Sequence, residues 1–181
     1  LRLHILEALS KINPEEPGTL SRIAEYSKSQ LVKSETRIAA TSLLLKLKNG
    51  VGTSTILSSA KEEIIGAVYT LAGENEQIAL QAVQHGASHY HRLSAANRIR
   101  LLPLVSSCRI PGAVDVFLEA LKDVDQEVRR GAYQILGECH AQGEGFSAIV
   151  HQLSEQVDPD PNLEEEALAG IQRMENVMEI H

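Results

Sequence analysis

Hydrophobic positions along this chain recur with the spacing of an α-helix, and polar turns separate the helical segments into pairs. The clearest pair covers residues 113–139. A Pro-Gly breaker precedes its first helix, which ends at Leu121, and a polar turn follows at 122–125. The second helix carries one apolar stripe, formed by Val128, Ala132, Ile135 and Leu136. This pattern predicts a helix hairpin whose apolar faces need neighbouring segments to cover them.

The second helix of this hairpin recurs along the sequence. Five segments can be placed in register, and a sixth, around 62–72, shares the stripe without a unique register. One position of the repeat is basic in four of them, at Arg2, Arg37, Arg98 and Arg129. First helices are expected at 19–29, 75–85 and 146–157. Residues 48–60 form an irregular joint, which predicts either a single helical turn at 53–58 or one long helix over 53–72.

The segment from 121 to 137 resembles the bacterial HEAT-like repeat first noted in phycobilisome lyases. The matching elements are an Asp-rich turn, Val-Arg, an Ala three residues later and a final Leu-Gly, here Asp123, Asp125, Val128, Arg129, Ala132, Leu136 and Gly137. The resemblance implies an all-α, right-handed α-solenoid of about five to six HEAT-like helix hairpins, forming a single domain over 1–181. It also implies that the second helices line a concave surface. It names no activity, because proteins that share a fold differ in function.

Composition supports the helical interpretation. Of the 181 residues, 43% are hydrophobic but only 3% are aromatic, and Trp is absent, which disfavours a sheet-rich fold. The sequence contains no apolar run of the roughly 18 residues that a membrane helix needs. Two cysteines without a CxxC motif, Cys108 and Cys139, predict reduced, buried thiols in a bacterial cytoplasm. The chain starts at Leu1 within a helical pattern, so we expect it to be part of a longer protein.

Charge is unevenly distributed along the sequence. The net charge of −7 divides into zero for 1–76, +4 for 77–114 and −11 for 115–181. The middle segment has no acidic residue, and we name residues 92–109 the basic collar because all four of its cations lie there. Such a collar would attract an acidic partner segment. The four cations are Arg92, Arg98, Arg100 and Arg109.

The repeated arginine has both a structural and a binding interpretation. A guanidinium at this position can bond carbonyl groups or an Asp in the adjacent turn and so tie repeats together. Asp123 and Asp125 are expected to bond the guanidinium of Arg129 in this way. The alternative is direct contact with a ligand. The structural repeat positions are Arg37, Asp123, Asp125, Val128, Ala132 and Leu136.

Three histidines, His85, His89 and His91, lie close together in the sequence. Zinc or nickel would accept such a group if the helix continued through it. Gly86 is expected to end the helix, however, and no Asp, Glu or Cys lies nearby. We therefore expect loop histidines beside the basic collar, with a metal site as the weaker alternative, and no cofactor.

No catalytic constellation can be recognised from residue spacing. HEAT-fold hydroxylases use repeated His-Glu pairs, which this sequence lacks. HEAT-like DNA glycosylases need a basic groove with aromatic side chains, and the acidic balance makes a nucleic-acid partner the weaker expectation.

The sequence thus favours a non-catalytic scaffold or regulatory module that binds a protein partner, one with an acidic segment, along the concave helix surface. Two alternatives stay open: a lyase-like or enzyme-accessory protein with a small-molecule pocket, and nucleic-acid binding through the basic collar. The expected partner-binding residues are Arg92, Arg98, Arg100, Arg129, Tyr90 and Tyr133.

Overall fold

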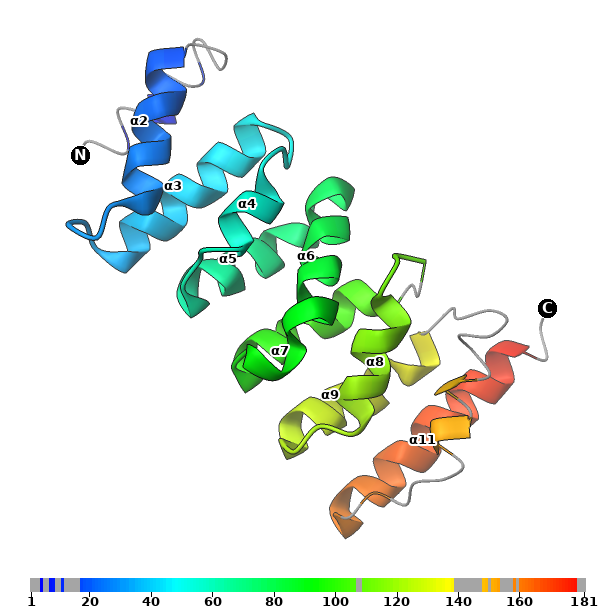
Figure 1. The fold of residues 1–181 in the computed structure, drawn as a ribbon. Coiled ribbons are helices and arrows are strands. Elements are labelled where there is room, and N and C mark those ends of the chain that lie inside the picture. The colour runs from blue at the N-terminus through cyan, green and yellow to red at the C-terminus, as the bar shows by residue number, and fades with distance from the viewer. Residues whose placement is uncertain are drawn as a thin grey trace. The chain divides into compact units, whose positions relative to one another are not determined.

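The computed structural model is all-α over the residues that it describes, which are 4, 7–8, 11, 17–106, 109–138, 148–149, 151–153, 158 and 160–178. These residues form helices and turns and contain no β-strand. The chain divides into two compact units, Leu1–Ala82 and Val83–His181. The division falls within one helix rather than at the irregular joint. Figure 1 shows the order of the helices along the chain.

The N-terminal unit contains α2 (Pro17–Lys28), α3 (Ser34–Leu47), α4 (Thr53–Leu57) and α5 (Glu62–Ala72). Helix α3 packs against both α2 and α5, and α4 packs against α5. The predicted first helix at 19–29 is therefore confirmed as α2. The α2–α3 core is centred on Ile23, Ala40 and Leu44.

The irregular joint contains a short helix and a sharp turn, not one long helix. Asn49, Gly50 and Gly52 have φ angles of 46°, 80° and 92°, which end α3. A Cβ atom at Gly50 would also lie 2.9 Å from the side chain of Ile78. The positive φ and this contact both restrict position 50 to glycine. Helix α4 begins after this turn, at Thr53, as a separate short helix.

Helix α6 (Glu76–His89) crosses from the first unit into the second. The expectation that Gly86 ends this helix is wrong, because α6 continues for three further residues. The glycine instead permits close packing: a Cβ atom there would lie 2.5 Å from Leu101 Cδ1. The short 3-10 helix η1 (Tyr90–Arg92) follows.

The C-terminal unit contains α7 (Ala95–Val105), α8 (Ala113–Leu121), α9 (Gln126–Ile135), the 3-10 helix η2 (Leu136–Glu138) and α11 (Pro161–Met178). The predicted hairpin is confirmed as α8 and α9. Helices α7, α8 and α9 pack against one another, and α9 and η2 also pack against α11. The second helices α7, α9 and α11 are thus adjacent in that order, as Figure 1 shows.

The core of the hairpin follows the predicted stripe at three of its four positions, because Ile135 is only half-buried. Val128, Ala132 and Leu136 are fully buried, as are Val116 and Phe117 on α8. Cys108 and Cys139 lie outside the described residues, as do most of the predicted helix at 146–157 and the repeat position Arg2.

Candidate functional site

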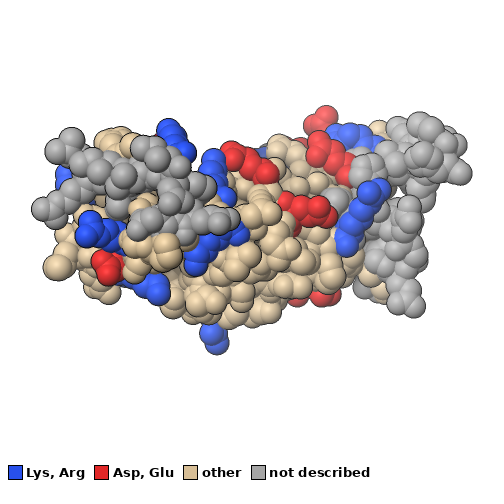
Figure 2. All heavy atoms as spheres, turned by 90° about the horizontal axis from the view of Figure 1, so that it is seen from above, with Lys and Arg blue, Asp and Glu red and all other residues tan. Residues whose placement is uncertain are grey.

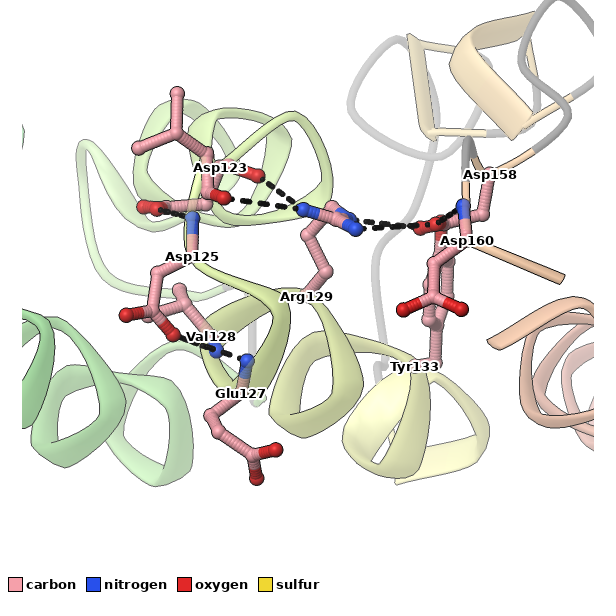
Figure 3. Close-up of polar contacts among 9 residues, drawn as sticks. Asp123, Asp125, Glu127, Val128, Arg129, Tyr133, Asp158 and Asp160 are labelled. Carbon is pink, nitrogen blue, oxygen red and sulfur yellow. Dashed lines mark hydrogen bonds and ion pairs between the residues drawn. The ribbon is translucent and has the colours of Figure 1, made fainter. Parts of the chain in front are cut away.

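The turn between α8 and α9 organises a buried polar network, drawn in Figure 3. Asp125 is the N-cap of α9, and its Oδ1 atom accepts hydrogen bonds from the amides of Glu127 (3.0 Å) and Val128 (3.3 Å). Asp123 Oδ1 accepts a hydrogen bond from the Asp125 amide at 2.9 Å. The two aspartates therefore fix the backbone of the turn, and the second oxygen of Asp123 remains for other donors.

Asp123 uses that second oxygen to bind residues from the preceding repeat. The Tyr90 hydroxyl donates to Asp123 Oδ2 at 2.7 Å, and Arg98 Nη1 lies 2.9 Å from the same atom. The Asp123 side chain is 0% exposed and that of Arg98 is 14% exposed. A carboxylate this deeply buried needs a charge partner and several donors, and Tyr90 and Arg98 supply them.

Arg129 joins the same turn to the next repeat. Its Nη1 atom donates to the carbonyl oxygens of Asp123 (2.8 Å) and Val124 (3.4 Å). Its Nε and Nη2 atoms donate to Asp158 Oδ2 (2.8 Å) and Oδ1 (3.2 Å). The Tyr133 hydroxyl donates to Asp158 Oδ2 at 2.9 Å. Figure 3 shows the guanidinium between the turn and Asp158.

The arrangement around Asp158 repeats the arrangement around Asp123. Asp158 Oδ1 accepts a hydrogen bond from the Asp160 amide at 2.8 Å, as Asp123 does from the Asp125 amide. In both places a carboxylate binds one Arg, one Tyr hydroxyl and the amide two residues later. We call these contacts the Arg–Asp ladder, which consists of Tyr90, Arg98, Asp123, Arg129, Tyr133 and Asp158.

Arg37 occupies the equivalent position in the N-terminal unit. Its Nη1 atom donates to the carbonyl of Val32 at 2.8 Å, and its Nη2 atom lies 2.9 Å from Glu63 Oε1. Arg37 thus binds an upstream carbonyl and a downstream carboxylate, as Arg129 does. The repeated arginine therefore has the same two kinds of partner in both units.

The contacts of the ladder shift the pKa values of several of its residues. Burial opposes ionisation of Asp158, but hydrogen bonds from Arg129, the Asp160 amide and Tyr133 outweigh it and lower the pKa of Asp158. The hydrogen bond to Asp158 raises the pKa of Arg129 against the opposing effect of burial. Burial and then the hydrogen bond to a carboxylate raise the pKa of both Tyr90 and Tyr133. The carboxylate and guanidinium of the 129–158 pair are therefore held charged, while both phenols are held neutral.

The pairing differs from the sequence-based expectation in one respect. Arg129 contacts the backbone carbonyl of Asp123, not its carboxylate, and takes Asp158 as its acidic partner. Asp125 caps its own helix. The difference arises because the Asp123 carboxylate faces the previous repeat, where Tyr90 and Arg98 already satisfy it.

The expected partner-binding residues fall into two groups. Tyr90, Tyr133 and Arg129 are buried, at 3%, 3% and 8% exposure, and together with Arg98 they belong to the ladder. Arg92 and Arg100 are exposed, and neither is paired with a carboxylate among the residues described. Arg100 Nη1 donates to Asn97 Oδ1 at 3.0 Å.

The three histidines do not converge on one point, and the expectation that they lie in a loop is wrong, because His85 and His89 lie in α6 and His91 lies in η1. The rings of His85 and His89 are stacked with centroids 4.6 Å apart, and His89 Nδ1 lies 3.1 Å from the carbonyl of His85. His91 Nε2 instead lies 3.3 Å from Glu119 Oε2. Within the described part of the chain, no group of three or more His, Cys, Asp or Glu side chains is arranged to hold a metal ion.

Each unit has a surface hollow. One, of about 680 Å³, lies in the C-terminal unit and is lined by residues 87–92 with Asp115, Val116 and Glu119. The other, of about 550 Å³, lies in the N-terminal unit between the end of α2, one face of α3, the short helix α4 and the start of α5. We name the second hollow the basic groove.

Sequence reasoning missed two features of the ladder. It did not identify Asp158 as the acceptor for Arg129. It also treated Tyr90 and Tyr133 as surface anchors. The spacing of Tyr133, one helical turn after Arg129, is a usable signal, because residues four apart lie on the same face of a helix.

Comparison with known proteins gives no match: no family model fits the chain, and no curated protein or solved structure is significantly similar to it.

None of the helices described is both long enough and apolar enough to cross a membrane.

Proposed function

We propose that this chain is a non-catalytic interaction scaffold, a HEAT-like α-solenoid that binds a protein partner through the basic collar of its C-terminal unit. The observation that carries the proposal is the contrast within the collar. Arg98 is engaged by Asp123, whereas Arg92 and Arg100 are exposed and unpaired with any carboxylate in the described chain. Exposed cations in a segment without acidic residues attract an acidic surface.

The Arg–Asp ladder supports this function indirectly. Buried charge pairs join α7 to the turn between α8 and α9, and α9 to Asp158, which precedes α11. A rigid support reduces the entropy that is lost when a partner binds to the side chains mounted on it. In this proposal the ladder holds the helices in place, and Arg92 and Arg100 contact the partner protein.

The proposal is tested with the double variant Arg92→Glu/Arg100→Glu. A matched control, Arg22→Glu/Lys122→Glu, makes the same change in net charge at exposed positions outside the collar. Proteins captured from an extract of the source cells are identified, purified and titrated against all three forms. We expect the collar variant to bind at least ten-fold more weakly, and the control to bind like the wild type.

Unchanged binding by the collar variant would overturn the role of the collar. Salt-sensitive binding of duplex DNA that the collar variant loses, with no protein partner affected, would instead assign the collar to nucleic acid.

A further inference from the structure

The basic groove of the N-terminal unit has the composition of a binding site. Helix α3 and its C-cap residue line it with a single face, since the lining residues recur at helical spacing: Arg37, Thr41, Leu44 and the C-cap Lys48. Lys28 lies at the end of α2, and Lys61 is the N-cap of α5. The remaining lining residues are small, apolar or hydroxyl-bearing, apart from Gln30.

The groove is positively charged, and of its four cations only Arg37 is paired with a carboxylate, that of Glu63. Lys28, Lys48 and Lys61 are exposed, and none of them is paired with a carboxylate among the described residues. No Asp or Glu lines the groove. Lys46, which lies on α3 but does not line the groove, is paired by contrast: its Nζ atom lies 3.1 Å from Glu74 Oε2. Figure 2 shows basic side chains gathered over this unit on the face drawn.

A buried hydroxyl lines the same groove. Thr41 is 1% exposed, and its Oγ1 atom has no hydrogen-bond partner in the described structure. Leaving a buried hydroxyl without a partner is unfavourable, and Thr41 shares the groove-lining face of α3 with Arg37 and Lys48.

The groove also has apolar walls. Ala24, Leu44, Ile56 and Ile64 line it, and Val51, which is 67% exposed, lies at its edge. A small inorganic anion would make no use of these side chains. A ligand that combines carboxylates with an apolar side chain would use the apolar walls and the lysines together.

We propose that the basic groove binds a short acidic peptide segment of a partner protein, with carboxylates beside the lysines and an apolar side chain between α3 and α4. Nucleic acid fits less well, because no aromatic side chain lines the groove to stack against a base. The inference rests on the proposed scaffold function, but it assigns a second site, which lies in the other unit.

The test uses direct peptide binding. The probe is a fluorescently labelled peptide of sequence Asp-Asp-Leu-Asp-Asp, titrated with the full chain at low salt and followed by fluorescence anisotropy. We expect saturable binding that weakens at least ten-fold in Lys28→Glu/Lys48→Glu. The matched control is Arg22→Glu/Lys33→Glu, which alters two exposed cations of the same unit outside the groove and should bind like the wild type.

Two further measurements define the ligand. A peptide with Ser in place of Leu should bind several-fold more weakly, because it cannot use the apolar walls. Thr41→Val keeps the shape of the side chain and removes a hydroxyl that solvent does not reach, so binding should stay like that of the wild type while the melting temperature stays close to that of the wild type or rises. Circular dichroism melts of every variant show that the helices are retained.

The collar variant Arg92→Glu/Arg100→Glu separates this proposal from the proposed function. If the groove is the site, this variant binds the peptide like the wild type. Peptide binding that the collar variant loses and the groove variant keeps would overturn the groove and leave the scaffold function standing. Equal binding of the Leu and Ser peptides, or displacement by millimolar inorganic phosphate, would show a simple anion site and overturn the peptide assignment.

Discussion

Arg129 and Asp158 face each other through two hydrogen bonds, Nε to Oδ2 at 2.8 Å and Nη2 to Oδ1 at 3.2 Å, although 29 residues of sequence separate them. The Asp158 side chain is fully buried and that of Arg129 is 10% exposed. Removing one partner of such a pair leaves an uncompensated buried charge, which costs far more than the net contribution of the intact pair.

Replacing this arginine is therefore expected to destabilise the protein strongly. Arg129→Met should lower the free energy of unfolding by about 3–5 kcal/mol, measured by urea denaturation. Arg130→Met is the control, because Arg130 pairs with Glu127 and Glu166 nearer the surface, and its effect should be much smaller. Similar losses in the two variants would contradict the structural role of the ladder.

Acid should weaken the ladder through Asp158. Its pKa is lowered in the folded protein, so the stabilisation is fully present above the unfolded pKa of about 3.9 and is lost progressively as the pH falls below that value toward and through the lower pKa of the folded state. Melting temperatures measured from pH 6 to pH 3 should therefore fall more steeply for the wild type than for Asp158→Asn. Parallel curves would show that Asp158 does not contribute to the acid sensitivity.

The two tyrosines of the ladder should behave alike. Each hydroxyl donates to a buried carboxylate, at 2.7 Å for Tyr90 and 2.9 Å for Tyr133. Changing either to Phe should cost about 1.5–3 kcal/mol of unfolding free energy, the usual range for a hydrogen bond to a charged group. Tyr26→Phe is the control, because the Tyr26 hydroxyl has no hydrogen bond among the described residues, and it should change stability by less than about 0.5 kcal/mol.

Two glycines should respond to alanine in opposite directions. A Cβ atom at Gly86 would lie 2.5 Å from Leu101, which is fully buried, so Gly86→Ala should cost about 1–3 kcal/mol of unfolding free energy. Gly73 has a φ of −62°, and a Cβ atom there would meet the Thr70 carbonyl oxygen at 3.6 Å, which is an ordinary van der Waals contact. Gly73→Ala should therefore be neutral or stabilise by up to about 1 kcal/mol. Chemical denaturation of both variants checks the contrast.

The helices could be predicted because each has its own apolar stripe, and the turn at 122–125 marks a hairpin without reference to the rest of the chain. The end of α6 could not be predicted, because Gly86 taken by itself indicates the end of a helix. Only the close contact with Leu101 in the folded protein explains why a glycine lies within α6.

The same limit applies to the candidate site. Sequence register places Arg37, Arg98 and Arg129 at one repeat position, but it does not show which carboxylate each one meets. That choice depends on which way Asp123 and Asp158 turn, and therefore on the packing of neighbouring repeats. The basic groove was missed because its lysines come from three separate elements that only the fold brings together.

The direction of the Arg–Asp pairing has a consequence for synthesis of the chain. Each arginine finds its carboxylate in the repeat that follows, so Arg129 leaves the ribosome well before Asp158 does. The α8–α9 hairpin therefore cannot complete its charge pairing until the next repeat has emerged. A nascent chain that stops short of Asp158 therefore holds a hairpin that is less stable than the finished one.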